Sequence, residues 1–180
     1  MQYSDEQWCG IWQPASTGRP MARFHEILLL IGQLNYTWTN TESLLIYLIA
    51  GLARVDKETA IVIFLTLNTT RARIELVERL TKMGKTPAAQ RQEILSITQQ
   101  LGRQAKLRNK YSHCIYSFDE TGDQASTQLM AIFDSKDTIK YGKIEQINEA
   151  EIARINEVIE QLQEVNREIW AIVDRYDFPR

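Results

Sequence analysis

The amino-acid sequence predicts a mainly α-helical protein with a small antiparallel β insertion before its last helix. Apolar residues recur at three- and four-residue steps over most of the chain, which is the periodicity of helices with one buried face. Only eight glycines and four prolines occur in 180 residues, which disfavours a turn-rich β fold. Only residues 114–143 alternate in a strand-like way. With 44% hydrophobic and 24% charged residues, the composition is that of one ordinary globular domain.

The N-terminal part divides into an irregular lead-in, residues 1–20, and the start of a single helical domain, residues 21–180. Glycine and prolines interrupt regular structure in the lead-in. From residue 21 to about 54 the helical rhythm of apolar residues is sustained. Weak helix formers in residues 37–41 interrupt it, and we expect one long helix, bent there, rather than two short ones.

Two further helices are predicted in the middle of the chain. Asp56 is a typical N-cap for a helix that runs to about Met83, and Gly84 is a typical helix terminator. Pro87 favours the first turn of the next helix, which continues into Arg108.

The β insertion is expected at about residues 114–143. Residues 114–118 alternate as a strand and are followed by a cluster of turn residues at 119–123. Residues 128–133 and 138–143 are the second and third strand candidates. The final helix, roughly residues 148–176, has a wide apolar stripe that is typical of a helix packed in a bundle.

Charge is distributed unevenly along the chain. The net charge is −2, yet residues 71–110 carry ten basic against three acidic side chains. This asymmetry predicts a local anion-binding surface on an otherwise acidic protein, with solvated helix faces as the alternative explanation.

The remaining compositional features predict a cytoplasmic protein. The two cysteines, Cys9 and Cys114, have no metal-ligand spacing, and no signal-peptide pattern opens the chain. Apolar runs at residues 27–31 and 44–53 are too short to span a bilayer. We therefore expect no membrane partner, no structural disulfide and no bound metal or cofactor.

The strongest chemical signal is the segment Arg-Asn-Lys-Tyr-Ser-His at residues 108–113. His113 is one of only two histidines in the chain, and Arg108 lies five positions before it. Around a helix end this spacing is about a turn and a half, so the guanidinium of Arg108 and the imidazole of His113 could converge on one ligand. A guanidinium that stays charged and an imidazole that titrates near neutrality suit phosphodiester chemistry. A core or capping role for His113 is the alternative.

This segment resembles the Arg-x4-6-His motif of the HEPN superfamily. The order of elements around it is similar as well: a Trp38…Glu42 pair on the first helix, Arg71 and Arg73 on the second, and a final apolar helix. The resemblance covers about residues 20–175. It implies a HEPN-like bundle of about four long helices that dimerises, so that two motifs meet in one cleft.

The resemblance also implies an activity, because many HEPN proteins are metal-independent endoribonucleases that act as toxins or in phage defence. Under this hypothesis His113 acts as base on the ribose 2′-hydroxyl or as acid on the leaving oxygen, and Arg108 stabilises charge on the phosphoryl oxygens. Asn109 orients the pair or bonds a phosphate. Lys110 and Tyr111 contact RNA, with packing of one of the two as the alternative. The expected partners are RNA, a second copy of the chain, and an antitoxin or other regulatory protein.

Several alternatives stay open at this point. Glu42 is either an exposed or capping residue or an acid that faces the Arg108/His113 site. A tyrosine that some HEPN toxins carry two residues after the histidine is replaced here by Ile115. Besides the ribonuclease, the sequence allows a non-catalytic HEPN module that binds nucleotide, RNA or a partner protein. A purely structural helical dimer, with Arg108 and His113 paired to Glu42, is the third hypothesis.

Overall fold

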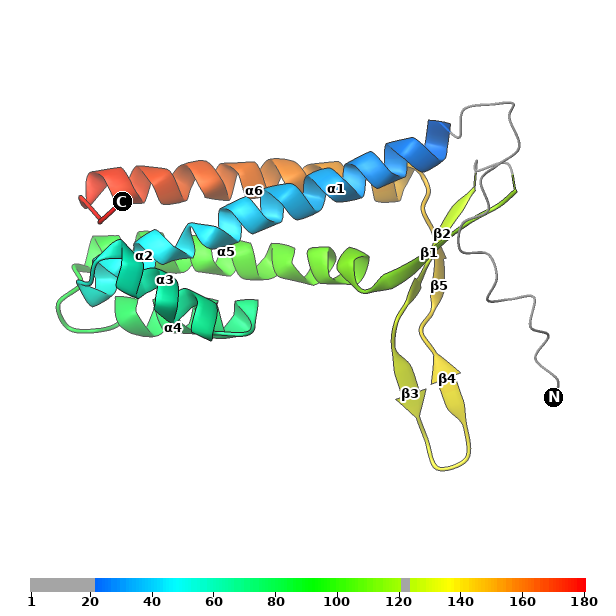
Figure 1. The fold of residues 1–180 in the computed structure, drawn as a ribbon, viewed down its shortest axis with the longest axis horizontal. Coiled ribbons are helices and arrows are strands. Elements are labelled where there is room, and N and C mark those ends of the chain that lie inside the picture. The colour runs from blue at the N-terminus through cyan, green and yellow to red at the C-terminus, as the bar shows by residue number, and fades with distance from the viewer. Residues whose placement is uncertain (1–21, 121–123) are drawn as a thin grey trace.

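The computed structural model describes residues 22–120 and 124–180, and the predicted lead-in at residues 1–20 lies outside this part of the chain. Helices form a bundle, and a small β region extends from one end of it (Figure 1). The helices are α1 (Ala22–Ser43), α2 (Leu45–Ala53), α3 (Lys57–Thr66), α4 (Thr70–Thr81), α5 (Ala88–Ser112) and α6 (Glu149–Arg175). The strands are β1 (Cys114–Phe118), β2 (Ala125–Leu129), β3 (Ile132–Asp134), β4 (Ile139–Tyr141) and β5 (Ile144–Gln146). The predicted mainly helical architecture with an antiparallel insertion before the last helix is confirmed.

The first predicted helix is divided into α1 and α2, with a single residue, Leu44, between them. The Thr41 hydroxyl donates to the carbonyl of Thr37 at 2.8 Å, and the Ser43 hydroxyl donates to the carbonyl of Asn40 at 2.8 Å. Such bonds compete with the backbone ladder and bend helices. α1 is continuous through the weak segment, residues 37–41, and the interruption lies three residues beyond it. The prediction of one long helix rather than two was therefore wrong.

The prediction of a single helix over residues 56–83 was wrong, because the chain forms two helices there, α3 and α4, with a break between them. Leu67 has extended backbone angles, and the Thr69 hydroxyl accepts the backbone N–H of Ala72 at 3.1 Å to start α4. The apolar periodicity continues through this break and conceals it. The predicted N-cap at Asp56 is present, since its carboxylate accepts the backbone N–H three residues on at 2.8 Å.

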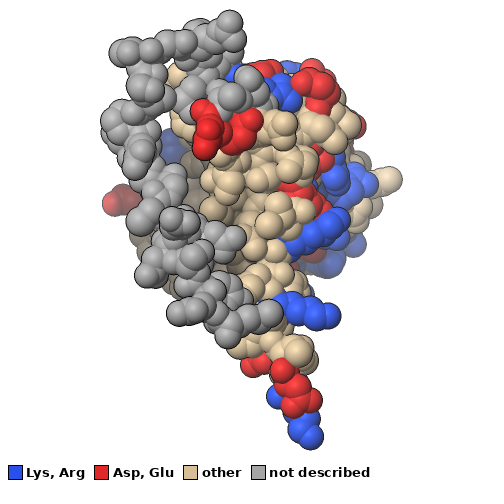
Figure 2. All heavy atoms as spheres, turned by 90° about the vertical axis from the view of Figure 1, so that its right-hand side faces the viewer, with Lys and Arg blue, Asp and Glu red and all other residues tan. Residues whose placement is uncertain are grey.

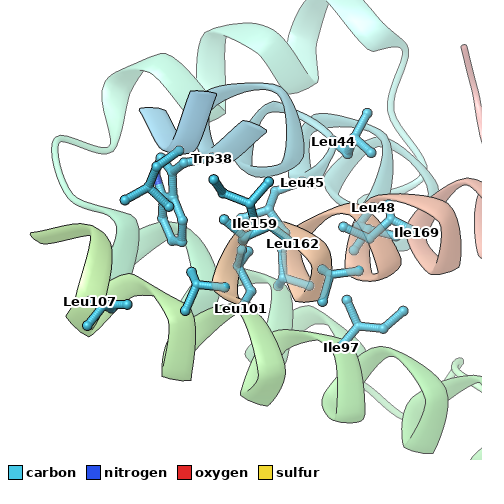
Figure 3. Close-up of a cluster of buried hydrophobic side chains, with 14 of the residues drawn as sticks. Trp38, Leu44, Leu45, Leu48, Ile97, Leu101, Leu107, Ile159, Leu162 and Ile169 are labelled. Carbon is cyan, nitrogen blue, oxygen red and sulfur yellow. The ribbon is translucent and has the colours of Figure 1, made fainter. Parts of the chain in front are cut away.

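The core lies between α1, α2, α5 and α6. Figure 3 shows the cluster, in which side chains from these helices converge. The predicted stripe of α6 is buried, as expected for a bundle helix. The helix-contributed residues with no exposed surface include Leu34, Leu45, Leu48, Leu101, Ile155, Leu162 and Ile169.

The β region forms two antiparallel units. One has the strand order β1-β2-β5 and packs at the end of the bundle, where α5 leads into β1 and β5 leads into α6 (Figure 1). The other is the hairpin β3–β4, which projects away from the helices. The predicted first strand is confirmed, but the predicted second strand is broken after Leu129, and β5 was not predicted. At the break, a Cβ on Gly142 would lie 1.9 Å from the Leu129 carbonyl oxygen, so the two chain segments approach more closely than a side chain permits.

Within the described ranges, no helix combines the length and the apolar character needed to cross a membrane.

Candidate functional site

Glu42 lies in a polar cluster between α1, α4 and α5, and it is only 8% exposed. Its carboxylate accepts the indole N–H of Trp38 at 3.1 Å and the hydroxyl of Thr70 at 2.6 Å. The Arg73 guanidinium is 3.1 Å from the same carboxylate. Arg108 joins the cluster by donating to the Thr70 hydroxyl at 3.3 Å, and its guanidinium carbon lies 4.5 Å from the centre of the Trp38 ring. Glu42 is therefore neither exposed nor a cap.

Two guanidinium groups lie near the Glu42 carboxylate: that of Arg73 contacts it, and that of Arg108 bonds Thr70. Burial lowers the pKa of Arg108, the charge of Glu42 opposes that shift, and the neighbouring Arg73 lowers the pKa further. An arginine remains protonated in proteins despite such shifts. The Nε atom of Arg108 is buried without a hydrogen-bond partner among the described residues. The cluster thus carries an excess positive charge and one unused donor.

His113 lies at the C-terminus of α5, where its backbone N–H donates to the carbonyl of Asn109 at 3.1 Å. Its carbonyl accepts the backbone N–H of Met130 at 3.0 Å, which fixes the start of the β region against the helix end. The side chain is exposed and borders a cavity of about 450 Å³. The cavity is lined by Lys106, Asn109, Lys110, His113, Cys114, Thr127, Leu129, Lys143 and Glu145.

Four lining residues follow helical spacing: Lys106, Asn109 and Lys110 of α5 and its C-cap, His113, are separated by three, one and three positions and share one side of the helix end. Arg108 contacts α1 and α4 instead. Residues five apart on an α-helix differ by about 140° around the axis. Within one chain the structure therefore brings Asn109 and Lys110 to His113, and Glu42 to Arg108, while the contacts of Arg108 and His113 are separate.

Lys110 and Tyr111 are held by internal contacts. The Lys110 ammonium lies 2.7 Å from Glu145 and 2.6 Å from Glu151. The Tyr111 ring is buried and its hydroxyl donates to Glu151. Burial raises the pKa of Tyr111 and the hydrogen bond to the carboxylate adds to the shift, so the hydroxyl stays protonated. These two residues join α5 to the first turn of α6, and Tyr111 has no free surface for RNA.

The sequence did not identify Lys106 and Lys143 as site residues. Lys106 could have been found, because it lies two helical turns before His113 on the same side of α5. Lys143 is brought to the cavity by the sheet, where its carbonyl accepts the backbone N–H of Leu129 at 3.4 Å. No local pattern predicts a contact over that distance in the sequence.

The contact between Lys110 and Glu151 predicts a pH window of stability. Burial alone would raise the pKa of Glu151, but hydrogen bonds from Lys110 and Tyr111 outweigh it and hold the pKa below its usual value. Burial alone would lower the pKa of Lys110, but the bonds to Glu145 and Glu151 hold it above its usual value. The carboxylate stabilises the fold above its unfolded pKa of about 4.3 and loses this effect as pH falls; the lysine stabilises below about 10.4 and loses this effect as pH rises.

Urea denaturation at several pH values tests this window. The difference in free energy of unfolding between the wild type and Glu151→Gln should be largest between about pH 5 and 10 and should shrink in acid. A difference that is independent of pH would show that the carboxylate charge does not contribute.

Within residues 22–120 and 124–180, no group of three or more histidine, cysteine, aspartate or glutamate side chains is placed to hold a metal ion. No family model matches the chain, and the comparisons with curated proteins and with solved structures found no match either.

Proposed function

We propose that the protein is a HEPN-type, metal-independent endoribonuclease in which His113 transfers the proton. The observation that carries this proposal is the position of His113, which is exposed at the border of a cavity with Lys106 and Asn109 on the same side of α5. Lys143 adds a cation from the sheet. Three lysines, the carboxylate of Glu145, an amide and an imidazole line the cavity, and the excess of cations suits a phosphodiester.

The reaction is attack of a ribose 2′-oxygen on the adjacent phosphorus. As the 2′-oxygen bonds to phosphorus, its proton passes to a base, the bond to the 5′-oxygen breaks, and that oxygen takes up a proton. His113 acts as this base or as this acid. Lys106 and Lys143 attract the phosphate, and Asn109 can bond its oxygens. DNA lacks the nucleophile and is not cleaved.

Arg108 enters the proposal through a second copy of the chain. Its contacts with Trp38 and Thr70 hold the guanidinium in a fixed orientation, and the cluster retains positive charge. Because Arg108 and His113 have separate contacts within one chain, we place their pairing in a cleft between two copies. RNA, a second copy and the cytoplasm are the proposed partners and setting.

Incubation of the purified protein with mixed RNA in excess chelator tests the activity. We expect fragments that end in 2′,3′-cyclic phosphate, because the 2′-oxygen is the nucleophile and the mechanism assigns no step to a metal. A single-stranded DNA of the same sequence is the matched control and should stay intact. Cleavage of DNA, or cleavage of RNA only when chelator is omitted, would contradict the mechanism.

A second candidate is a HEPN module that binds a mononucleotide without cleaving RNA. The cavity volume of about 450 Å³ favours it, because small-molecule sites measure roughly 300–1,000 Å³. Saturable binding of adenosine monophosphate, weakened by Lys106→Ala, together with intact RNA in the cleavage assay would support this module over the ribonuclease.

A further inference from the structure

The β3–β4 hairpin and its flanks, residues 129–144, form an arm with an unusual concentration of exposed apolar side chains. Of the fourteen large hydrophobic side chains that are exposed in the described part of the chain, seven belong to this arm. They are Leu129, Met130, Ile132, Phe133, Ile139, Tyr141 and Ile144. Figure 2 shows uncharged surface that continues from the body of the molecule onto the arm, with charged side chains at its tip. Clusters of this kind mark interaction surfaces.

The arm has no core of its own. All six residues of β3 and β4 are exposed, and within the described residues each strand pairs only with the other. A two-stranded hairpin without a supporting layer is only marginally stable in water, and both of its edges are open. The register pairs Ile132 with Tyr141 and Asp134 with Ile139, so one side of the ribbon presents Ile132, Ile139 and Tyr141 with Asp134, and the opposite side presents Phe133 and Lys140. This side needs a surface to cover it.

The outer side of α1 is a matching surface. Residues 27–41 contain no charged side chain, although the helix is on the outside of the bundle. Leu28, Leu29 and Tyr36 are 48%, 74% and 72% exposed. A surface helix usually carries charged residues on its outer side, so an uncharged outer side indicates a covered one.

We propose that the arm of one copy packs on the outer side of α1 of a second copy, and the reverse, in a two-fold dimer. Each copy then contributes both surfaces, as an isologous interface requires. Without Phe133, which lies on the opposite side of the ribbon, six arm side chains and three α1 side chains are available. Nine side chains of this exposure provide roughly 900 Å² per copy, close to the ~800 Å² of a standard interface. The arm tip carries Asp134, Lys136, Asp137 and Lys140, which balance in charge and favour protein over nucleic acid as the occupant.

The interface begins next to the candidate site. The backbone N–H of Met130 donates to the carbonyl of His113, and Leu129 lines the His113 cavity. The proposal thus deepens the proposed function, which needs two copies, by naming the surfaces that join them. The test of the dimer contains no RNA, so the proposed dimer and the proposed ribonuclease activity can be refuted independently.

Sedimentation equilibrium of the full chain tests the dimer. Three double variants are compared with the wild type: Ile132→Ser/Ile139→Ser on the arm, Leu29→Ser/Tyr36→Ser on α1, and Val62→Ser/Leu65→Ser on α3. The α3 pair is the matched control, because Val62 and Leu65 are 62% and 64% exposed but belong to neither surface. We expect a wild-type dimer, a dissociation constant raised by about 100-fold or more in the arm and α1 variants, and an unchanged control.

A monomeric wild type, a dimer insensitive to the arm variant, or a dimer weakened by the α3 variant would overturn the proposal. Circular dichroism checks that each variant is folded. We expect all of them to fold, because the substituted side chains are exposed. Cross-linking then tests the contact itself. A variant with a photoreactive residue at position 141 is prepared in unlabelled and isotopically labelled form, and the two forms are mixed. We expect cross-links that join labelled to unlabelled chain at α1; cross-links confined to one chain, or directed to another helix, would refute the pairing.

Discussion

Replacement of His113 by alanine is expected to lower RNA cleavage by about 10²–10⁴-fold, the contribution of one general acid or base. The side chain is exposed, and the helix-end bonds at this position use only its backbone atoms. The substitution should therefore remove the imidazole without unfolding the chain. His25→Ala is the matched control, because His25 is the other histidine and is an exposed residue on α1. Initial rates on a defined RNA measure both variants.

Retained activity in His113→Ala would exclude His113 as the proton-transfer residue. An equal loss in His25→Ala would show that the effect is not specific to the cavity. Loss in His113→Ala alone, with the thermal unfolding midpoint unchanged, would locate the chemistry at the end of α5.

Mixing two inactive variants tests whether Arg108 and His113 act across two copies. Arg108→Met keeps an unbranched side chain that can pack on Trp38, while it removes the charge and the hydrogen-bond donors. In a mixed dimer with His113→Ala, one of the two symmetry-related Arg108/His113 pairs would be intact. Random mixing should then restore about a quarter of the wild-type activity. No recovery in a mixture that forms mixed dimers would show that the two residues act within one chain, or that Arg108 is only structural.

The sequence predicted those parts of the fold that depend on local periodicity. The stripe of α6 and the alternation of β1 are short-range patterns, and both elements were found where the patterns lie. The break between α3 and α4 was missed because the apolar rhythm continues across residues 67–69, where a hydroxyl cap restarts the helix. The bend after β2 was missed because it depends on the close approach of Gly142 to Leu129, a contact between segments.

In the candidate site, too, contacts along one helix were predictable and contacts between helices were not. Spacing on α5 would have added Lys106 to the side of Asn109, Lys110 and His113. It did not show that Arg108, which was expected to converge with His113, contacts α1 and α4 instead. The Trp38–Glu42 pair was visible as one helical turn, and the indole does bond the carboxylate. Thr70, however, lies 28 positions from Glu42, so its bridge to Arg108 follows only from the packing of α4 on α1 and α5.

Glu42→Gln is expected to lower the free energy of unfolding by about 3 kcal/mol, because it removes the buried ion-pair partner of Arg73 and the negative charge near Arg108. The amide keeps the size of the side chain, so the loss reports charge rather than packing. Urea denaturation measures it. Glu75→Gln is the matched control: Glu75 also faces two arginines, but that pair of contacts is on the surface, and its loss should leave the free energy of unfolding almost unchanged.

Combining Glu42→Gln with Arg73→Met separates the two arginines. If Glu42 mainly compensates Arg73, the double variant should be more stable than the sum of the single losses predicts, because the uncompensated charge has been removed. A double variant with strictly additive losses would instead indicate that Glu42 acts mainly on Arg108. In that case Glu42→Gln should also reduce RNA cleavage at temperatures where the chain is fully folded, since the carboxylate would then hold the guanidinium that the proposed cleft requires.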